Sequence, residues 1–453
     1  MKVLKVLMCV FLVGIQISPV YADELSDLKI LVQQMKSEYE SKIRDLETKI
    51  ERIESNQNSS VEAKVSEMRT ELKEEIKKET FQVEYVGRHN APVGDGGIVV
   101  KNPHGFGNVS LGGYADMEYH DLDGSESTFR QHRWIINLAA QVTDRIRFNS
   151  EYELEYGSSN APAGDGEAKV EQAYIDYLIN EKINLRAGAL LVPFGRYNLY
   201  HDSDLQDLTE RPILAKDITP TTWTEAGYGF FGEFNPTLGS YEDLLLQYEL
   251  YAINGLDGGF SDTGMGGARS SLKSDNNDNK AVVGRLMMSP LTGHELGLSG
   301  YWGRYDNAND NALSGVGVDL FNTFGPIELI NEYAYFGIEE TPSVSSDVAN
   351  YFQGAYSQVN YYFWPEFLTN TFLGRGFEDP TLTLVGRYDW GLIHDDSDAG
   401  VGNNEEERYT IGLNYRPVDS FVVKFEYHFS DTDNEALEQG KKDGFITSVA
   451  LGF

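Results

Sequence analysis

Cysteine is almost absent from this chain of 453 residues, and its single copy, Cys9, lies in the N-terminal apolar segment. Residues 1–22 start with two lysines, continue as an apolar run and end in Val20-Tyr21-Ala22, which predicts a cleaved secretory signal peptide. The mature chain would then lack cysteine, so it would enter an oxidising compartment without disulfides. No lipobox-like context follows Cys9, so a lipoprotein is not expected.

Long hydrophobic runs are also missing, because no apolar stretch after residue 22 is long enough for a transmembrane helix. Basic residues are scarce: 37 Lys and Arg oppose 71 Asp and Glu, for a net charge of -34. An exported chain of this kind is periplasmic, secreted or an outer-membrane barrel. The mean hydropathy of -0.39 does not exclude a barrel, since alternating apolar and polar residues average out.

Glycine and proline are absent from residues 23–86, where apolar residues recur in steps of three or four. This thin stripe consists of Leu25, Leu28, Val32, Met35, Tyr39, Ile43, Leu46, Ile50 and Ile53, and it resumes at Val61, Val65, Met68, Leu72 and Ile76. Such a stripe needs a partner helix, so we predict a periplasmic α-helical coiled coil that self-associates, as a homotrimer. The alternative is a solvated helix that covers another part of the same chain.

Residues 87–108 are rich in Gly, Pro and Asn and are predicted to be a linker, and residues 109–453 read as a series of strands. Residues 421–429 show the pattern best, because aromatic and aliphatic residues alternate with Lys424, Glu426 and His428. Short turns such as 143–145 and 418–420 alternate with long polar loops, which is typical of outer-membrane barrels. The connection 364–380 fits poorly, because it is long and apolar where a short turn is expected.

The fold class predicted from this pattern is all-β, a transmembrane antiparallel barrel of about 16 strands preceded by the coiled coil. The last segment, residues 445–453, alternates and ends in Phe453, a pattern that resembles the recognition signal of outer-membrane proteins. The predicted location is the outer membrane, with lipid and lipopolysaccharide as partners. The N-terminal coiled coil is predicted to lie in the periplasm.

Parity along the strands predicts which charged side chains point into the lumen, opposite the lipid-facing aromatics. The predicted lumen-lining residues are Arg133, Arg147, Glu151, Glu153, Arg186, Arg387, Asp389, Arg416, Lys424 and Glu426. Acidic and basic walls of this kind can orient a solute in a transverse field. The alternative is that these charges only solvate a water-filled lumen.

The connection 193–225 is the strongest functional candidate, because it carries many apolar anchors that should pack against something. We predict that it folds into the lumen as a constriction, with a surface lid as the alternative. Its charged members are Arg196, His201, Asp202, Asp204, Asp207, Glu210, Arg211, Lys216 and Asp217. His201, Asp202 and Asp204 are metal-ligand types, but acidic loops are usually solvated, so no metal site and no cofactor are predicted.

The motifs 186–196 (RAGALLVPFGR), Glu210-Arg211-Pro212 and 222–227 (TWTEAG) resemble the phosphate-selective porin O and P family. The resemblance implies a sixteen-stranded trimeric porin whose third outer loop folds into the pore. Phosphate selectivity needs many basic donors in the lumen. From residue 101 onward, however, 9 Lys and 14 Arg oppose 54 Asp and Glu, so the sequence leaves cation or anion preference open.

The predicted function is therefore passive diffusion of small hydrophilic or ionic solutes through a water-filled channel. A structural tether that links the outer membrane to the cell wall through the coiled coil is the alternative. An enzyme is not predicted, because no nucleophile motif accompanies His294 or His428.

Overall fold

The computed structural model forms two units, Met1–Thr80 and Phe81–Phe453, which are described separately. The residues it describes are 35–49, 64, 66–73, 81–87, 94, 96–102, 105, 107–157, 166–237, 244–260, 264–339, 349–394, 404–432 and 443–453. In the first unit, residues 35–49 and 66–73 are helical. None of the helices among the described residues is long and apolar enough to cross a membrane. The predicted signal peptide lies outside the described residues.

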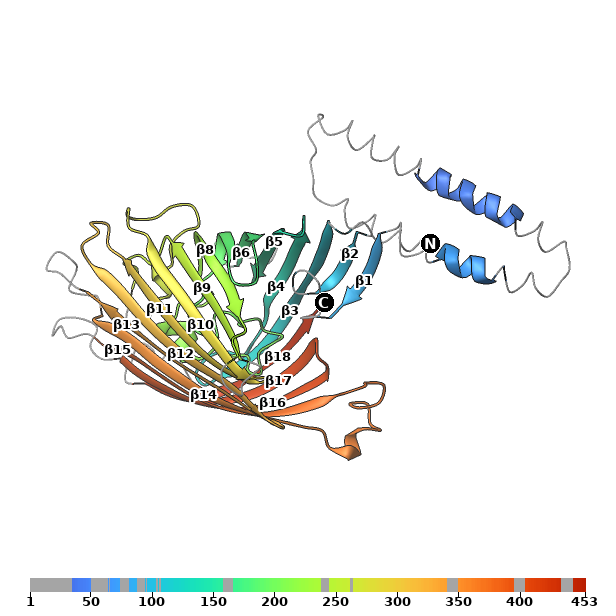
Figure 1. Cartoon of the computed structure of the whole chain (residues 1–453). Helices are drawn as coiled ribbons and strands as arrows, with labels where there is room; N and C mark the ends of the chain where they lie inside the picture. The colour runs from blue at the N-terminus through green and yellow to red at the C-terminus, as the bar shows by residue number, and fades with distance from the viewer. Residues whose placement is uncertain are drawn as a thin grey trace. The chain divides into compact units, whose positions relative to one another are not determined.

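The second unit is one antiparallel sheet in which each strand pairs with the next along the chain (Figure 1). Its sixteen main strands are β3 (Asn108–Leu122), β4 (Thr128–Gln141), β5 (Ile146–Glu155), β6 (Glu167–Leu178), β7 (Asn184–Leu191), β8 (Thr224–Phe234), β9 (Leu245–Ile253), β10 (Ala281–Leu291), β11 (His294–Arg304), β12 (Ala312–Phe324), β13 (Ile327–Ile338), β14 (Tyr351–Phe363), β15 (Thr381–His394), β16 (Asn404–Val418), β17 (Phe421–Thr432) and β18 (Gly444–Gly452).

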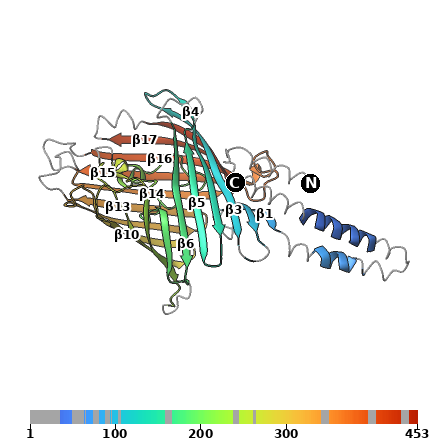
Figure 2. The ribbon, with the colours of Figure 1, turned by 90° about the horizontal axis from the view of Figure 1, so that it is seen from above.

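Pairing of β18 with β3 closes these sixteen strands into a barrel, so the predicted sixteen-stranded barrel is confirmed, whereas the coiled coil stays a prediction. Figure 2 shows the strands side by side around the wall of the barrel. Closure leaves no unpaired edge, which is the condition for a sheet that lies in lipid. Side chains alternate across the wall: along β17, Lys424, Glu426 and His428 are buried, whereas Phe425, Tyr427 and Phe429 are exposed on the outer face.

Two further strands precede the barrel, β1 (Gln82–Val86) and β2 (Gly97–Lys101). They pair with each other, and β2 also pairs with β3. The helical prediction is therefore wrong for residues 82–86, because their polar and apolar residues alternate with the period of a strand. β2 lies in the segment predicted as a linker, where valines and an isoleucine complete a short ladder with β3.

The connections differ in length at the two ends of the barrel. Pairs of residues such as Thr292-Gly293 and Gly325-Pro326 join strands at one end, whereas 192–223 and 254–280 are long connections at the other. The connection 364–380 is the exception at the end with short connections, and it contains the 3-10 helix η4 (Glu366–Leu368). Its Phe367 and Phe372 side chains are 77% and 86% exposed, so this apolar connection does not join the barrel interior.

Candidate functional site: the lumen loop

Residues 192–223, which connect β7 to β8 and which we call the lumen loop, lie inside the barrel. Both ends of the loop are fixed by aromatic packing. Phe194 and Trp223 are fully buried, and the ring of Phe194 lies 4.8 Å from that of Phe336 on β13. The Trp223 ring lies 5.3 Å from that of Tyr301 on β11. These apolar anchors hold the loop against the inner wall and away from solvent.

A glycine turn begins the loop two residues after the proline of the Val192-Pro193-Phe194-Gly195-Arg196 motif. Gly195 has φ 73°, a left-handed conformation that glycine adopts without steric cost. Its N–H donates to Ser299 Oγ at 3.1 Å, and the N–H of Tyr197 donates to Glu332 Oε2 at 2.9 Å. Arg196 pairs with Glu295. The turn therefore directs three consecutive residues onto β11 and β13.

The middle of the loop is held by hydrogen bonds from its backbone to one carboxylate. Glu426 on β17 accepts from Thr209 N at 2.6 Å and from Glu210 N at 2.9 Å. Thr209 Oγ1 lies 2.7 Å from Ser448 Oγ on β18. Asp207 accepts from Asn360 Nδ2 on β14 at 2.7 Å. Bonds to an ionised carboxylate are stronger than neutral ones, so this region is firmly attached to the wall.

Four cations of β15, β16 and β17 donate to backbone carbonyls of the lumen loop. Arg387 donates to Glu210 O at 2.8 Å, Lys424 to Ser203 O at 2.6 Å and Arg416 to Asp204 O at 2.8 Å, and Arg408 donates to Arg211 O. Arg387, Arg408 and Lys424 are at most 5% exposed. These charges therefore serve to anchor the loop, and the loop separates them from solution.

The remaining charged loop residues form local contacts. Lys216 Nζ donates to Glu210 Oε1 at 2.8 Å, and Arg211 donates to Thr221 O at 2.8 Å. Burial alone would raise the pKa of Glu210, but Lys216 and Arg408 bring it well below its ordinary value. Asp217 lies in the short π-helix η2 (Leu214–Ile218), and its carbonyl accepts from Met265 N at 2.9 Å. The connection between β9 and β10 thus contacts the loop as well.

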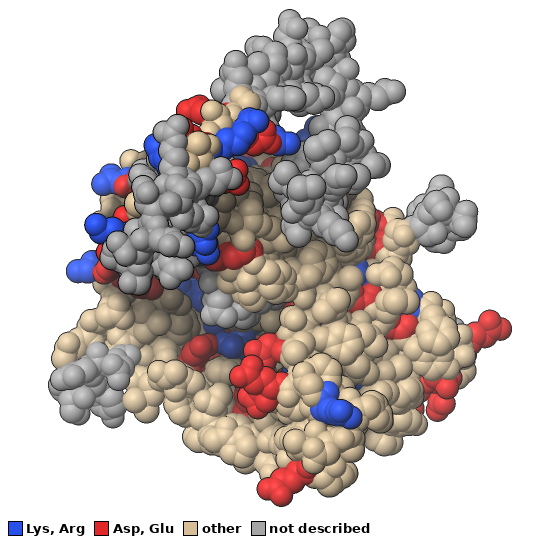
Figure 3. All heavy atoms as spheres, turned by 90° about the vertical axis from the view of Figure 1, so that its right-hand side faces the viewer, with Lys and Arg blue, Asp and Glu red and all other residues tan. Residues whose placement is uncertain are grey.

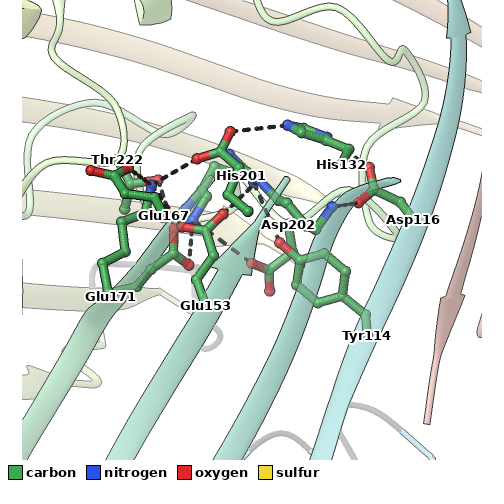
Figure 4. Close-up of polar contacts among 12 residues, drawn as sticks. Tyr114, Asp116, His132, Glu153, Glu167, Glu171, His201, Asp202 and Thr222 are labelled. Atoms are coloured by element: carbon green, nitrogen blue, oxygen red, sulfur yellow. Dashed lines mark hydrogen bonds and ion pairs between the residues drawn. The ribbon is translucent and has the colours of Figure 1, made fainter. Parts of the chain in front are cut away.

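Acidic residues dominate the inner wall formed by β3, β4, β5 and β6. Arg133 and Glu153 are paired at 2.9 Å, and Lys169 lies 2.8 Å from the other oxygen of Glu153. Glu151 accepts from Gln172 at 2.8 Å. A β-bulge opposite Asp116 turns both His132 and Arg133 inward, and Figure 4 shows His132 beside Asp116. The bulge adds a second imidazole to a wall on which strict alternation already places His120.

Arg147 and Arg186 lie apart from the lumen loop, beside a cavity of about 670 Å³ at the end with the short turns. Arg186 pairs with Asp176 at 2.7 Å and lies over the Tyr174 ring at 4.0 Å. Figure 3 shows a hollowed face with acidic and basic side chains in and around the hollow. The sequence-predicted residues thus divide into a set in contact with the loop, a set at this mouth, and Arg133, Glu151 and Glu153 on the acidic wall.

Sequence reasoning missed several residues that hold the loop. Arg408 lies on the same face of β16 as Arg416, so the alternation along this strand predicts that its side chain also points inward. Glu332, Glu295 and Glu171 contact the loop from three different strands. Strand parity predicts that Glu295 and Glu332 point inward, whereas Glu171 points inward because it lies in a β-bulge of β6. The loop partners of all three depend on the path of the loop.

The closed sixteen-stranded barrel with its inward-folded loop defines an outer-membrane channel for small solutes. The model of the family described as phosphate-selective porin O and P matches residues 109–320 of the chain. This match agrees with the resemblance seen in the central motifs. The class is that of a channel rather than an enzyme.

Individual proteins are also similar to this chain. A protein of Aquifex aeolicus (strain VF5), described as uncharacterized, is 26% identical over 368 residues, which is 76% of this chain and 79% of that protein. The structure of Salmonella typhi OmpF in complex with daunomycin is 13% identical, with a TM-score of 0.51 over 77% of this chain and 98% of that chain. The trimer form of Vibrio cholerae OmpT is 11% identical, with a TM-score of 0.50 over 77% and 100% of the two chains. At these identities the solved structures show the shared fold.

Proposed function

We propose that the lumen loop is the constriction of this channel and that the channel prefers cations. The loop crosses the interior from β7 and contacts the wall from β11 to β18. A solute must therefore pass between the loop and the rest of the wall. Small hydrophilic or ionic solutes fit such a path, because polar side chains on both sides replace part of their hydration.

The cation preference is inferred from the four cations of β15, β16 and β17, because they hold the lumen loop in place. Four wall cations donate to loop carbonyls, which reduces their effect on passing anions: Arg387, Arg408, Arg416 and Lys424. The whole chain has an excess of acidic residues, with a net charge of -34. An excess of negative charge around a pore concentrates cations and repels anions at moderate ionic strength.

Reversal potential across a salt gradient in a planar bilayer tests this proposal. Purified protein should give stepwise conductance and a reversal potential of the sign expected for cation preference. Raising the salt concentration on both sides should reduce the preference, because surface charges are screened. Anion preference that phosphate blocks would overturn the cation assignment, and a lack of conductance would contradict the channel.

We further propose a homotrimer with the N-terminal helices in the periplasm. The solved OmpT structure is a trimer form, and Met35, Ile43 and Met68 on the helices described here are 43–49% exposed, which suits a partner helix. Light scattering of the detergent-solubilised protein, with the detergent mass subtracted, should give three chains. A monomer would contradict this assembly.

A further inference from the structure

Three metal-ligand side chains meet where the lumen loop contacts β6. Glu171 comes from β6, and His201 and Asp202 come from the loop. Figure 4 shows the three side chains close together on the inner face of the wall. Glu171 and His201 are 2% and 4% exposed, so this is a buried site and not a solvated acidic loop.

The surrounding hydrogen bonds fix the orientation of the His201 ring. Its Nδ1 lies 2.9 Å from the carbonyl oxygen of Asn198, which can only accept, so Nδ1 carries a proton. Asn198 is itself fixed, because its Oδ1 accepts from Trp223 N at 2.9 Å and its Nδ2 donates to Val192 O at 2.8 Å. Nε2 therefore faces the carboxylates. A metal-binding histidine is held in the same way, with its other nitrogen bonded to a carbonyl.

The distance from Nε2 to Glu171 is long for a charge-assisted hydrogen bond and matches the spacing of two ligand atoms on one zinc ion, whereas Asp202 Oδ1 would have to move closer to complete the site. Nε2 lies 3.4 Å from Glu171 Oε2 and 3.9 Å from Asp202 Oδ1. A charge-assisted N–H···O bond is about 2.7–2.9 Å long. Two ligand atoms on one tetrahedral zinc ion, each bound at about 2.0–2.2 Å, lie roughly 3.4 Å apart. The other oxygen of Glu171 accepts from Thr222 Oγ1 at 3.1 Å, which orients the carboxylate.

We propose that Glu171, His201 and Asp202 bind one divalent transition-metal cation, for which Zn²⁺ is the matching probe. One imidazole nitrogen and two carboxylate oxygens are ligand types that zinc accepts, and three protein ligands leave a fourth position for water. A dication at this position would balance the negative charges of the two carboxylates.

A neighbouring cluster with the same residue types provides an internal comparison. His132 Nδ1 lies 2.9 Å from Asp116 Oδ2 and 2.8 Å from Glu118 Oε1, and its Nε2 lies 3.4 Å from Glu155 Oε1. Both nitrogens of His132 thus face carboxylates, and the Nδ1 distances are those of hydrogen bonds. This geometry is that of a protonated histidine in an ion-pair cluster, so His132 is a matched control for His201.

A cation at the proposed site would link the lumen loop to the wall opposite its main anchors. Most contacts of the loop reach β11 to β18, whereas Glu171 belongs to β6. The bound cation would strengthen the attachment that His201 and Thr222 already make to Glu171. If the loop is the constriction, Zn²⁺ should reduce fluctuations of the open-channel current.

Equilibrium dialysis of the purified, folded full-length protein against zinc chloride, followed by metal analysis, tests the site without reference to conductance. The wild type should retain one more zinc ion per chain than His201→Gln, whose affinity should fall at least about tenfold. Asp202→Asn should also weaken binding, and His132→Gln should bind as the wild type does. Resistance of the barrel to SDS at room temperature verifies that each variant is folded.

Cobalt provides a second readout, because Co²⁺ in a tetrahedral site with nitrogen and oxygen ligands has intense visible absorption bands. These bands should appear with the wild type and with His132→Gln, and they should be absent from His201→Gln. Equal zinc binding by wild type and His201→Gln would overturn the proposal. Loss of zinc in His132→Gln alone would assign the metal to the neighbouring cluster and overturn it as well.

Discussion

At the scale of single residues, Gly195 explains why the central motif contains a glycine after Pro193-Phe194. Its backbone has φ 73°, and a Cβ atom at this position would overlap Glu332 Oε1. Glu332 is the carboxylate that accepts from Tyr197 N. The glycine therefore allows both the turn into the lumen and the close approach of the carboxylate that fixes the next residues.

Gly195→Ala should destabilise the start of the lumen loop. The left-handed backbone costs an alanine about 1–2 kcal/mol, and displacement of Glu332 adds to this. We expect a lower thermal unfolding midpoint and a noisier, larger single-channel conductance. The matched control is Gly300→Ala, because a Cβ at Gly300 has no neighbour within 4 Å. Equal effects of the two substitutions would show that the turn does not depend on Gly195.

Glu426 provides a second test at the residue scale, because one carboxylate holds two backbone N–H groups of the loop. Glu426→Ala leaves Thr209 N and Glu210 N without this acceptor, and each bond to a charged group contributes about 1.5–3 kcal/mol. The loop should detach locally, and single-channel conductance should rise. Glu378→Ala, at an exposed position on the connection 364–380, should leave conductance unchanged. Unaltered conductance in Glu426→Ala would remove this carboxylate from the set of anchors.

At the scale of elements, alternation predicted the strands because lipid outside and polar groups inside impose a period of two. The same rule indicates the inward parity of Lys424 and Glu426. It does not indicate that Lys424 meets Ser203 O or that Glu171 meets His201, because these pairs depend on how a long loop folds. The rule also fails at the bulge at His132, because the extra residue changes the alternation of side chains along β4.

The hairpin of β1 and β2 shows a further limit at this scale. Gln82–Val86 follows a long helical pattern, and its alternation is too short to compete with that pattern. The partners that make it a strand lie in β2, within a segment rich in glycine. Gly97 has φ 85°, and a Cβ there would overlap the Leu111 carbonyl of β3.

Gly97→Val should therefore release the hairpin without opening the barrel. The substitution combines an unfavourable left-handed backbone with overlap against β3. Hydrogen exchange should become faster at Val99 and Val100 and remain slow in β17. If β2 of the variant exchanges hydrogen as slowly as in the unaltered chain, the predicted role of Gly97 is wrong.

At the scale of the whole molecule, the barrel and the N-terminal unit should be separable in function. The barrel unit begins at Phe81, and its described strands pair among themselves. Deletion of residues 23–80, with the predicted signal peptide kept, should leave conductance and ion preference unchanged and weaken only assembly. If the chain is a tether, the deletion should instead weaken the attachment of the outer membrane to the cell wall. Loss of conductance on deletion would contradict the separation.

The central claim, that the lumen loop lies against β17 and β18 inside the barrel, is tested most directly by a disulfide. Thr209 Oγ1 and Ser448 Oγ lie 2.7 Å apart, so Thr209→Cys with Ser448→Cys places two thiols within bonding reach. We predict that mild oxidation links the pair in the folded protein and that single-channel conductance is the same before and after linkage. Thr209→Cys with Ser357→Cys, whose second position is on the outer face of β14, should not link. Failure of the first pair to link, or a large change of conductance when it does, would contradict the claim.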